Sequence, residues 1–154
     1  MLSEQNLKKV EELKQRFPTT KPLTLPVLWM IQEQHGYISQ EAMRYVAQLL
    51  NVTYGHVYGV VSFYSMYNDR PVGRYHLQVC TNISCMLRGA EKICDRVSRK
   101  LGIRVGETTT DKKFTLSEVE CLGSCGTAPM MQINDDYYED LNEERVDRIL
   151  GMLK

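Results

Sequence analysis

The sequence predicts a mixed α+β or α/β chain in two parts, a helical bundle over residues 1–70 and a domain of strands and helices over residues 71–154. Apolar residues recur at helical spacing before residue 70, whereas after it YHLQV alternates in the manner of a half-buried strand. Between the two patterns lies NDRPVGR, residues 68–74, which is rich in turn-forming residues. We therefore place the boundary there.

Four helices are expected in the first part. The first ends at the proline-containing segment RFPTTKP, and the others begin at residues that can cap a helix, Thr24, Ser39 and Thr53. Pro26 suits the first turn of the second helix, which Gly36 ends. The expected apolar stripes are Leu7, Val10, Leu13 and Phe17 on the first helix, Met43, Val46, Ala47 and Leu50 on the third, and Val57, Val60, Val61 and Tyr64 on the fourth.

The second part reads as strand, helix, three strands and a closing helix. YHLQV runs directly into Cys80, and KFTLSEVEC runs into Cys121, so each cysteine loop follows a strand. A helix from Gly89 lies between them, with Ala90, Ile93, Val97 and Leu101 on its apolar side. PMMQIND and DYYEDL form two strands around an Asn-Asp-Asp turn, and Asn142 caps the last helix.

Four of the five cysteines occur as two spaced pairs, in CTNISC at 80–85 and CLGSC at 121–125. Thiolates suit iron-sulfur clusters and zinc, and four of them complete either one tetrahedral zinc site or the two irons of a 2Fe-2S cluster. The spacing alone leaves three readings open: a cluster, zinc, and thiol redox chemistry without metal. The fifth, Cys94, lies beside Ile93 on an apolar stripe and is expected to be a buried core thiol.

A cluster would need hydrogen-bond donors around its sulfur ligands. Two ferric ions, two sulfides and four thiolates sum to a charge of about −2, and one added electron makes about −3. Backbone N–H groups at Gly123 and Gly126 can approach sulfur closely, and hydroxyls of Ser84, Ser124 and Thr127 are candidate donors. The absence of histidine from both loops favours a low-potential centre.

Composition narrows the function classes. Hydrophobic residues make up 43% and charged residues 25%, with Lys plus Arg and Asp plus Glu at 19 each, so nothing favours nucleic-acid binding. The longest apolar run, VLWMI, is too short to span a bilayer, and the sequence MLSEQNLKKV is unlike a signal peptide. We expect a cytoplasmic protein. No G-x-G-x-x-G loop follows a strand, so we expect neither a dinucleotide site nor hydride chemistry in this chain.

The array CTNISC, CLGSCGTAPMMQINDDYYEDL and the preceding GVVSFYSMY resembles the thioredoxin-like 2Fe-2S subunits of bacterial NADH-quinone oxidoreductases, respiratory complex I. The resemblance covers essentially the whole chain and implies a thioredoxin-like 2Fe-2S ferredoxin domain over 71–154. One departure is TNIS, where relatives often carry a glycine. The cluster ligands that it implies are Cys80, Cys85, Cys121 and Cys125.

The resemblance also implies an electron-transfer role with no catalytic residue in the chain itself. One electron would pass to the cluster from FMN in a neighbouring flavoprotein subunit, which also binds NADH, and further iron-sulfur subunits of the peripheral arm would be partners. The assembly would lie on the cytoplasmic side, peripheral to the inner membrane. Alternative hosts are an NAD-reducing hydrogenase and an NAD-dependent formate dehydrogenase, and the alternative of another class is a structural zinc-binding interaction module.

The sequence also gives expectations for an aromatic run, an acidic stretch and a proline. GVVSFYSMY, residues 59–67, is core or a docking surface for the flavoprotein, and the acidic stretch from Asp135 to Glu144 is a solvated turn and helix start. Pro129, close behind Cys125, resembles the cis-proline of thioredoxins, and the sequence leaves its isomer open.

Overall fold

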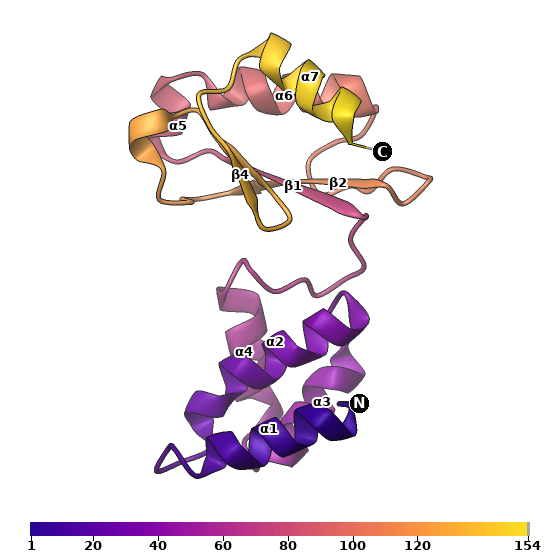
Figure 1. Ribbon diagram of the computed structural model, residues 1–154, viewed down its shortest axis with the longest axis vertical. Helices are drawn as coiled ribbons and strands as arrows, with labels where there is room; N and C mark the ends of the chain where they lie inside the picture. The colour runs from indigo at the N-terminus through magenta and orange to yellow at the C-terminus, as the bar shows by residue number, and fades with distance from the viewer. Residues whose placement is uncertain (154) are drawn as a thin grey trace. The chain divides into compact units, whose positions relative to one another are not determined.

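The computed structural model describes residues 1–153, which form two compact units that meet in sequence at Pro71 and Val72 (Figure 1). The first unit is helical and the second contains the four-stranded sheet.

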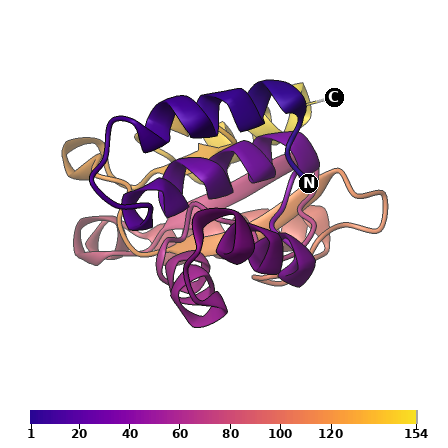
Figure 2. The same cartoon turned by 90° about the horizontal axis from the view of Figure 1, so that it is seen from below.

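The first unit consists of α1 (Glu4–Lys14), a short 3-10 turn η1 (Lys21–Leu23), α2 (Thr24–His35), α3 (Gln40–Leu50) and α4 (Tyr54–Phe63). Figures 1 and 2 show α1 alongside α2, and the Asn6 side chain donates a hydrogen bond to Gln34 at 2.8 Å. Fully buried side chains from all four α-helices make one core, among them Val10, Val27, Leu28, Ile31, Val46, Leu50 and Val57.

The predicted caps of α3 and α4 are confirmed, because the Ser39 and Thr53 hydroxyls accept hydrogen bonds from the backbone amides three residues on. Two details of the prediction are wrong. Phe17 lies beyond the end of α1 and is 41% exposed, because the chain turns away after Gln15. Thr24 is the first residue of α2 and not its cap, since η1 leads directly into that helix and places Leu23 at the cap.

The second unit is built on a sheet in the order β2-β1-β3-β4. Its strands are β1 (Tyr75–Cys80), β2 (Phe114–Val119), β3 (Met131–Ile133) and β4 (Asp136–Tyr138); β1 pairs with β2 in parallel, and the other two pairings are antiparallel. Figure 1 shows α6 (Ala90–Leu101) and α7 (Glu143–Met152) on the same side of this sheet. The predicted mixed fold of helices and strands is thereby confirmed.

One face of the sheet forms the core beneath α6 and α7. Leu77 of β1 is paired with Leu116 of β2 on one side and with Ile133 of β3 on the other, and all three are buried. Paired residues share a face, so this row points toward the helices together with Ile93 and Val146. The predicted cap of α7 is confirmed, since the Asn142 side chain accepts from the Arg145 amide.

The aromatic run GVVSFYSMY divides between the core and the surface of the first unit. Val61 and Tyr67 are buried, whereas Phe63 is 79% exposed and Met66 is 44% exposed. The Tyr67 hydroxyl donates to the Leu25 carbonyl at 2.8 Å, which fixes the end of the run against α2. The run is therefore part core and part exposed surface, and its role in docking stays a prediction.

Candidate metal centre

Parallel pairing of β1 and β2 brings the two cysteine loops to one edge of the sheet. Cys80, the last residue of β1, is in register with Val119, the last residue of β2, and Cys121 follows two residues later. The Thr81 amide extends the pairing by donating to the Val119 carbonyl at 2.9 Å. Because parallel strands end at the same edge, cysteines far apart in sequence become neighbours.

The first cysteine pair is buried. Cys80 is 4% exposed and Cys85 is 2% exposed, and both pack in a small cluster with Ala90, Ala128 and Met130. The segment between them is not an open loop as the sequence suggested: a short helix, α5 (Ile83–Leu87), carries Cys85, and the Asn82 side chain caps it. The turn brings Cys85 back beside Cys80.

Three of the four thiols lie close enough to affect one another. Burial is the largest cause that raises the pKa of Cys85, to about 11, followed by the hydrogen bond and charge repulsion of Cys80; Cys125 raises it further. A metal must therefore displace a proton that this thiol holds firmly at neutral pH, and iron or zinc binding would release it.

The second cysteine pair is exposed. Cys121 and Cys125 both lie at the surface, and Cys125 opens the 3-10 turn η2 (Cys125–Thr127). Figure 1 shows this turn next to α5. Gly123 has φ +81°, a conformation that L residues rarely adopt, and its amide donates to the Cys121 sulfur at 3.4 Å. The prediction that Gly123 supplies a backbone donor to sulfur is confirmed.

The predicted hydroxyl donors of the second loop point elsewhere. Ser124 Oγ and Thr127 Oγ1 both donate to Oε1 of Glu139, the latter at 2.7 Å, and the two hydroxyl oxygens lie 2.8 Å apart. A hydroxyl has a single proton, so a hydroxyl that donates to the carboxylate has none left for sulfur. The expectation that Ser124 and Thr127 donate to the cysteine sulfurs is therefore wrong. Their acceptor, Glu139, lies in the acidic stretch from Asp135 to Glu144, which was expected to be a solvated turn and helix start.

Cys94 and Pro129 are two further residues that the sequence singled out. Cys94 lies on the buried face of α6, and its thiol donates to Oε1 of Glu118 at 3.3 Å, which confirms its expected place in the core. Burial first, and then the Glu118 carboxylate, raise the pKa of Cys94 to about 12. The peptide bond between Ala128 and Pro129 is cis.

The donors gathered at this edge of the sheet are the thiols of the two cysteine pairs. Within residues 1–153, no three His, Cys, Asp or Glu side chains converge as ligands of a single ion. A tetrahedral zinc site needs four donors at about 2.0–2.3 Å from one point. A 2Fe-2S cluster takes four cysteine thiolates, two at each iron, so a donor set of four cysteines fits it.

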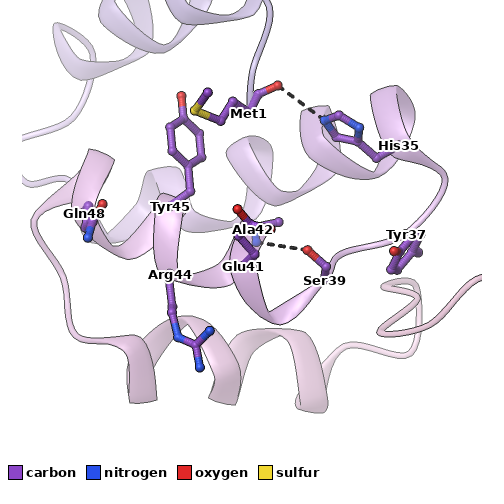
Figure 3. Close-up of a pocket in the computed structure, with 9 residues that line it drawn as sticks. All are labelled: Met1, His35, Tyr37, Ser39, Glu41, Ala42, Arg44, Tyr45 and Gln48. Carbon is purple, nitrogen blue, oxygen red and sulfur yellow. Dashed lines mark hydrogen bonds between the residues drawn. The ribbon is translucent and has the colours of Figure 1, made fainter.

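A separate pocket lies in the helical unit (Figure 3), with a volume of about 570 Å³. Its charged and aromatic side chains do not converge: Figure 3 shows Arg44 and Tyr45 pointing in opposite directions, and His35 hydrogen bonded to the Met1 carbonyl at 3.3 Å. The pocket is lined by Met1, His35, Tyr37, Ser39, Glu41, Ala42, Arg44, Tyr45 and Gln48, none of them a cysteine. We assign it no chemistry.

Across residues 1–153, none of the helices combines the length and the apolar character needed to cross a membrane.

The family model described as thioredoxin-like [2Fe-2S] ferredoxin matches residues 10–154. A relative from Rickettsia felis, the NADH-quinone oxidoreductase subunit designated E, is 46% identical over 148 residues, which cover 94% of this chain and 89% of the relative. The NADH-quinone oxidoreductase subunit designated E 2 of Rhizobium meliloti is 43% identical over 141 residues, covering 92% of this chain and 84% of the relative.

Among solved structures, an NAD+-reducing [NiFe]-hydrogenase in the air-oxidised state superposes with a TM-score of 0.69. The superposition covers 82% of this chain but only 22% of the hydrogenase chain, at 19% sequence identity. At that identity the likeness shows a shared fold and nothing more.

Proposed function

Because this chain belongs to the thioredoxin-like [2Fe-2S] ferredoxin family, we propose that its two cysteine pairs hold one 2Fe-2S cluster and that it is the electron-carrying subunit of an NADH-quinone oxidoreductase. The observation that carries the proposal is the parallel pairing of β1 with β2, which sets Cys80 opposite Val119 and both loops at one edge. The proposed ligands are Cys80, Cys85, Cys121 and Cys125.

Different residues of the chain have different roles around this site. The fold buries Cys80 and Cys85 against Ala128 and Met130, which keeps water from one side. Gly123 directs its amide at the Cys121 sulfur, where it would stabilise negative charge. When bound, the cluster supplies one-electron storage, a chemistry that no amino-acid side chain here provides.

Exposure of the second pair makes the site accessible to an electron donor. The exposed side of α5 adds apolar surface: Ile83, Met86 and Leu87 are 66%, 56% and 77% exposed. An exposed apolar group of this kind beside a redox site suits docking of a protein partner. We propose that the partner is the flavoprotein subunit that binds FMN and NADH, with further iron-sulfur subunits of the peripheral arm completing a cytoplasmic assembly peripheral to the inner membrane.

The relatives favour an NADH-quinone oxidoreductase as the host. Those that cover more than nine-tenths of this chain at 43–46% identity carry that name, whereas the likeness to the hydrogenase is one of fold. We propose no second host.

The test is metal analysis of the full chain purified without oxygen, with iron, acid-labile sulfide and zinc measured on the same sample. We expect two irons and two sulfides per chain, a red-brown colour, and an electron paramagnetic signal only after reduction, because two coupled ferric ions have zero net spin. A colourless protein with one zinc per chain contradicts the proposal.

A further inference from the structure

The end of β4 and the residues that follow it hold the loop that carries Cys121 and Cys125. Backbone amides of Asp140 and Leu141 donate to the carbonyls of Thr127 and Pro129 at 2.8 and 2.9 Å, and the Tyr137 hydroxyl donates to the Leu122 carbonyl at 2.7 Å. We refer to residues 137–141 as the strap. It contacts the second cysteine loop on both sides of Cys125.

Glu139 is the centre of the strap. Its Oε1 atom accepts from Thr127 Oγ1 at 2.7 Å and from Ser124 Oγ. Ser124 is the cap of η2 and Thr127 is its last residue, so the two hydroxyls lie on either side of Cys125 in sequence. These two hydroxyls also lower the pKa of Glu139, so the side chain carries its negative charge at neutral pH. One carboxylate thus fixes the loop and places a charge beside it.

We propose that Glu139 is a positioning residue that orients the Cys125 loop and keeps the reduction potential of the centre low. The inference rests on the proposed function, since it concerns the same cysteines. Two effects act in the same direction. Glu139 withholds the Ser124 and Thr127 protons from sulfur, and hydrogen bonds to sulfur raise the potential. Its charge also repels the electron that takes the centre from about −2 to about −3.

Two substitutions separate charge from loop anchoring. Glu139→Gln keeps a carbonyl oxygen that can accept from Ser124 and Thr127 but removes the charge, whereas Glu139→Ala removes both. Asp135→Asn is the matched control, because it removes the same charge from the turn that joins β3 to β4. The turn closes one end of the hairpin formed by β3 and β4. At the other end Met131 pairs with Tyr138 and with Val79, the residue before Cys80, so the turn is the end of the hairpin away from the cysteines.

The measurement is a redox titration of the full, cluster-loaded chain, followed by electron paramagnetic resonance. At a fixed solution potential, Glu139→Gln should raise the ratio of reduced to oxidised cluster about three- to tenfold, where tenfold corresponds to about 59 mV for one electron. Glu139→Ala should raise it at least as far, because it also frees both hydroxyls, and Asp135→Asn should leave it within about twofold.

The possible outcomes are distinct. Equal potentials for Glu139→Gln and Asp135→Asn, both with full iron content, would overturn this inference and leave the proposed function intact. Absence of iron and sulfide from the unmodified chain would instead overturn the proposed function and this inference with it. A further outcome is loss of iron from Glu139→Gln alone. If that variant then has the same melting temperature and circular dichroism as Asp135→Asn, the result supports loop positioning. If the Glu139→Gln protein is unfolded, the result contradicts loop positioning.

Discussion

The five cysteines differ in what surrounds their sulfur atoms. Cys94 donates to Glu118 inside the core, whereas the other four gather at the edge where β1 and β2 end. Burial, followed by the Glu118 carboxylate, raises the pKa of Cys94 to about 12, and burial likewise raises the pKa of Cys85 to about 11. Position at the ends of β1 and β2, and not the pKa, therefore distinguishes the candidate ligands.

Substitution of the cysteines tests this division. Replacing any one of Cys80, Cys85, Cys121 or Cys125 by Ala removes one of four iron bonds, and we expect iron content to fall at least about fivefold. Cys94→Ala should retain both irons and both sulfides, at a cost of about 1–2 kcal/mol in stability for the small cavity. Full iron content after Cys121→Ala, or its loss in a folded Cys94→Ala protein, would contradict the assignment.

Gly73 shows how closely the chain before β1 approaches β2. A Cβ atom at this position would lie 2.8 Å from the backbone C and N atoms of Phe114, and the Gly73 amide donates to Thr115 Oγ1 at 2.6 Å. Backbone atoms within a paired strand cannot move aside without breaking hydrogen bonds to β1. We expect Gly73→Ala to lower the free energy of unfolding by about 1–3 kcal/mol in chemical denaturation.

Gly151 provides the control for this substitution. It lies in α7 with open space around the position of a Cβ atom, so Gly151→Ala should leave stability unchanged or raise it by about 0.5–1 kcal/mol through helix propensity. Equal unfolding free energies for the two variants would show that the contact between Gly73 and Phe114 does not constrain β2.

At the scale of elements, an ion pair joins the two helices that cover the sheet. Arg96 of α6 donates from Nε to Asp147 Oδ1 of α7 at 3.0 Å and from a second guanidinium nitrogen to Oδ2. Hydrogen bonding from Arg96 is the main cause that lowers the pKa of Asp147. The charged carboxylate is therefore the form that the folded state prefers.

The pH dependence of this pair follows from the direction of the pKa. A carboxyl whose pKa is lowered on folding contributes stability above its unfolded value of about 3.9, and that contribution is lost as the pH falls. Asp147→Asn should therefore destabilise the protein near pH 7, with a difference from the unmodified chain that shrinks below about pH 4. A difference for Asp147→Asn that is constant with pH would rule out the ionic contribution.

Local signals in the sequence were sufficient for three of the four predicted helix caps, all but Thr24, but not for the contacts around the site. Ser39, Thr53 and Asn142 cap helices through bonds to amides three residues away, and such signals can be read from neighbours in sequence. Glu139 reaches Ser124 across 15 residues, and nothing in the acidic stretch distinguishes it from Asp135 or Glu144. The two spaced pairs of candidate thiol ligands can be read from the sequence, whereas the partners of the residues beside them depend on how β4 and the strap fold back.

At the scale of the whole molecule, the chain is expected to store electrons without taking them from NADH directly. NADH delivers a hydride, which carries two electrons, whereas a 2Fe-2S centre accepts one, so a flavin must stand between them. The sequence shows no G-x-G-x-x-G loop for a dinucleotide. We expect the isolated, cluster-loaded chain to keep its oxidised absorbance when NADH is added without oxygen.

The proposed flavoprotein partner should change that result. Mixed with the FMN-containing subunit, the same chain should co-purify with it and lose visible absorbance within one NADH titration, provided that the potential of its centre lies within reach of NADH.

Charged Lys or Glu substitutions at Met86 and Leu87, which are 56% and 77% exposed on α5, should weaken the association at least about tenfold, because a charge on an apolar contact must lose its water. The same substitutions should leave iron content unchanged, since neither side chain is a proposed ligand. Rapid bleaching of the lone, flavin-free chain by NADH would reveal a cofactor site in this chain, and unchanged association of the α5 variants would place the docking surface elsewhere, with the exposed Phe63 and Met66 of the first unit as the next surface to test.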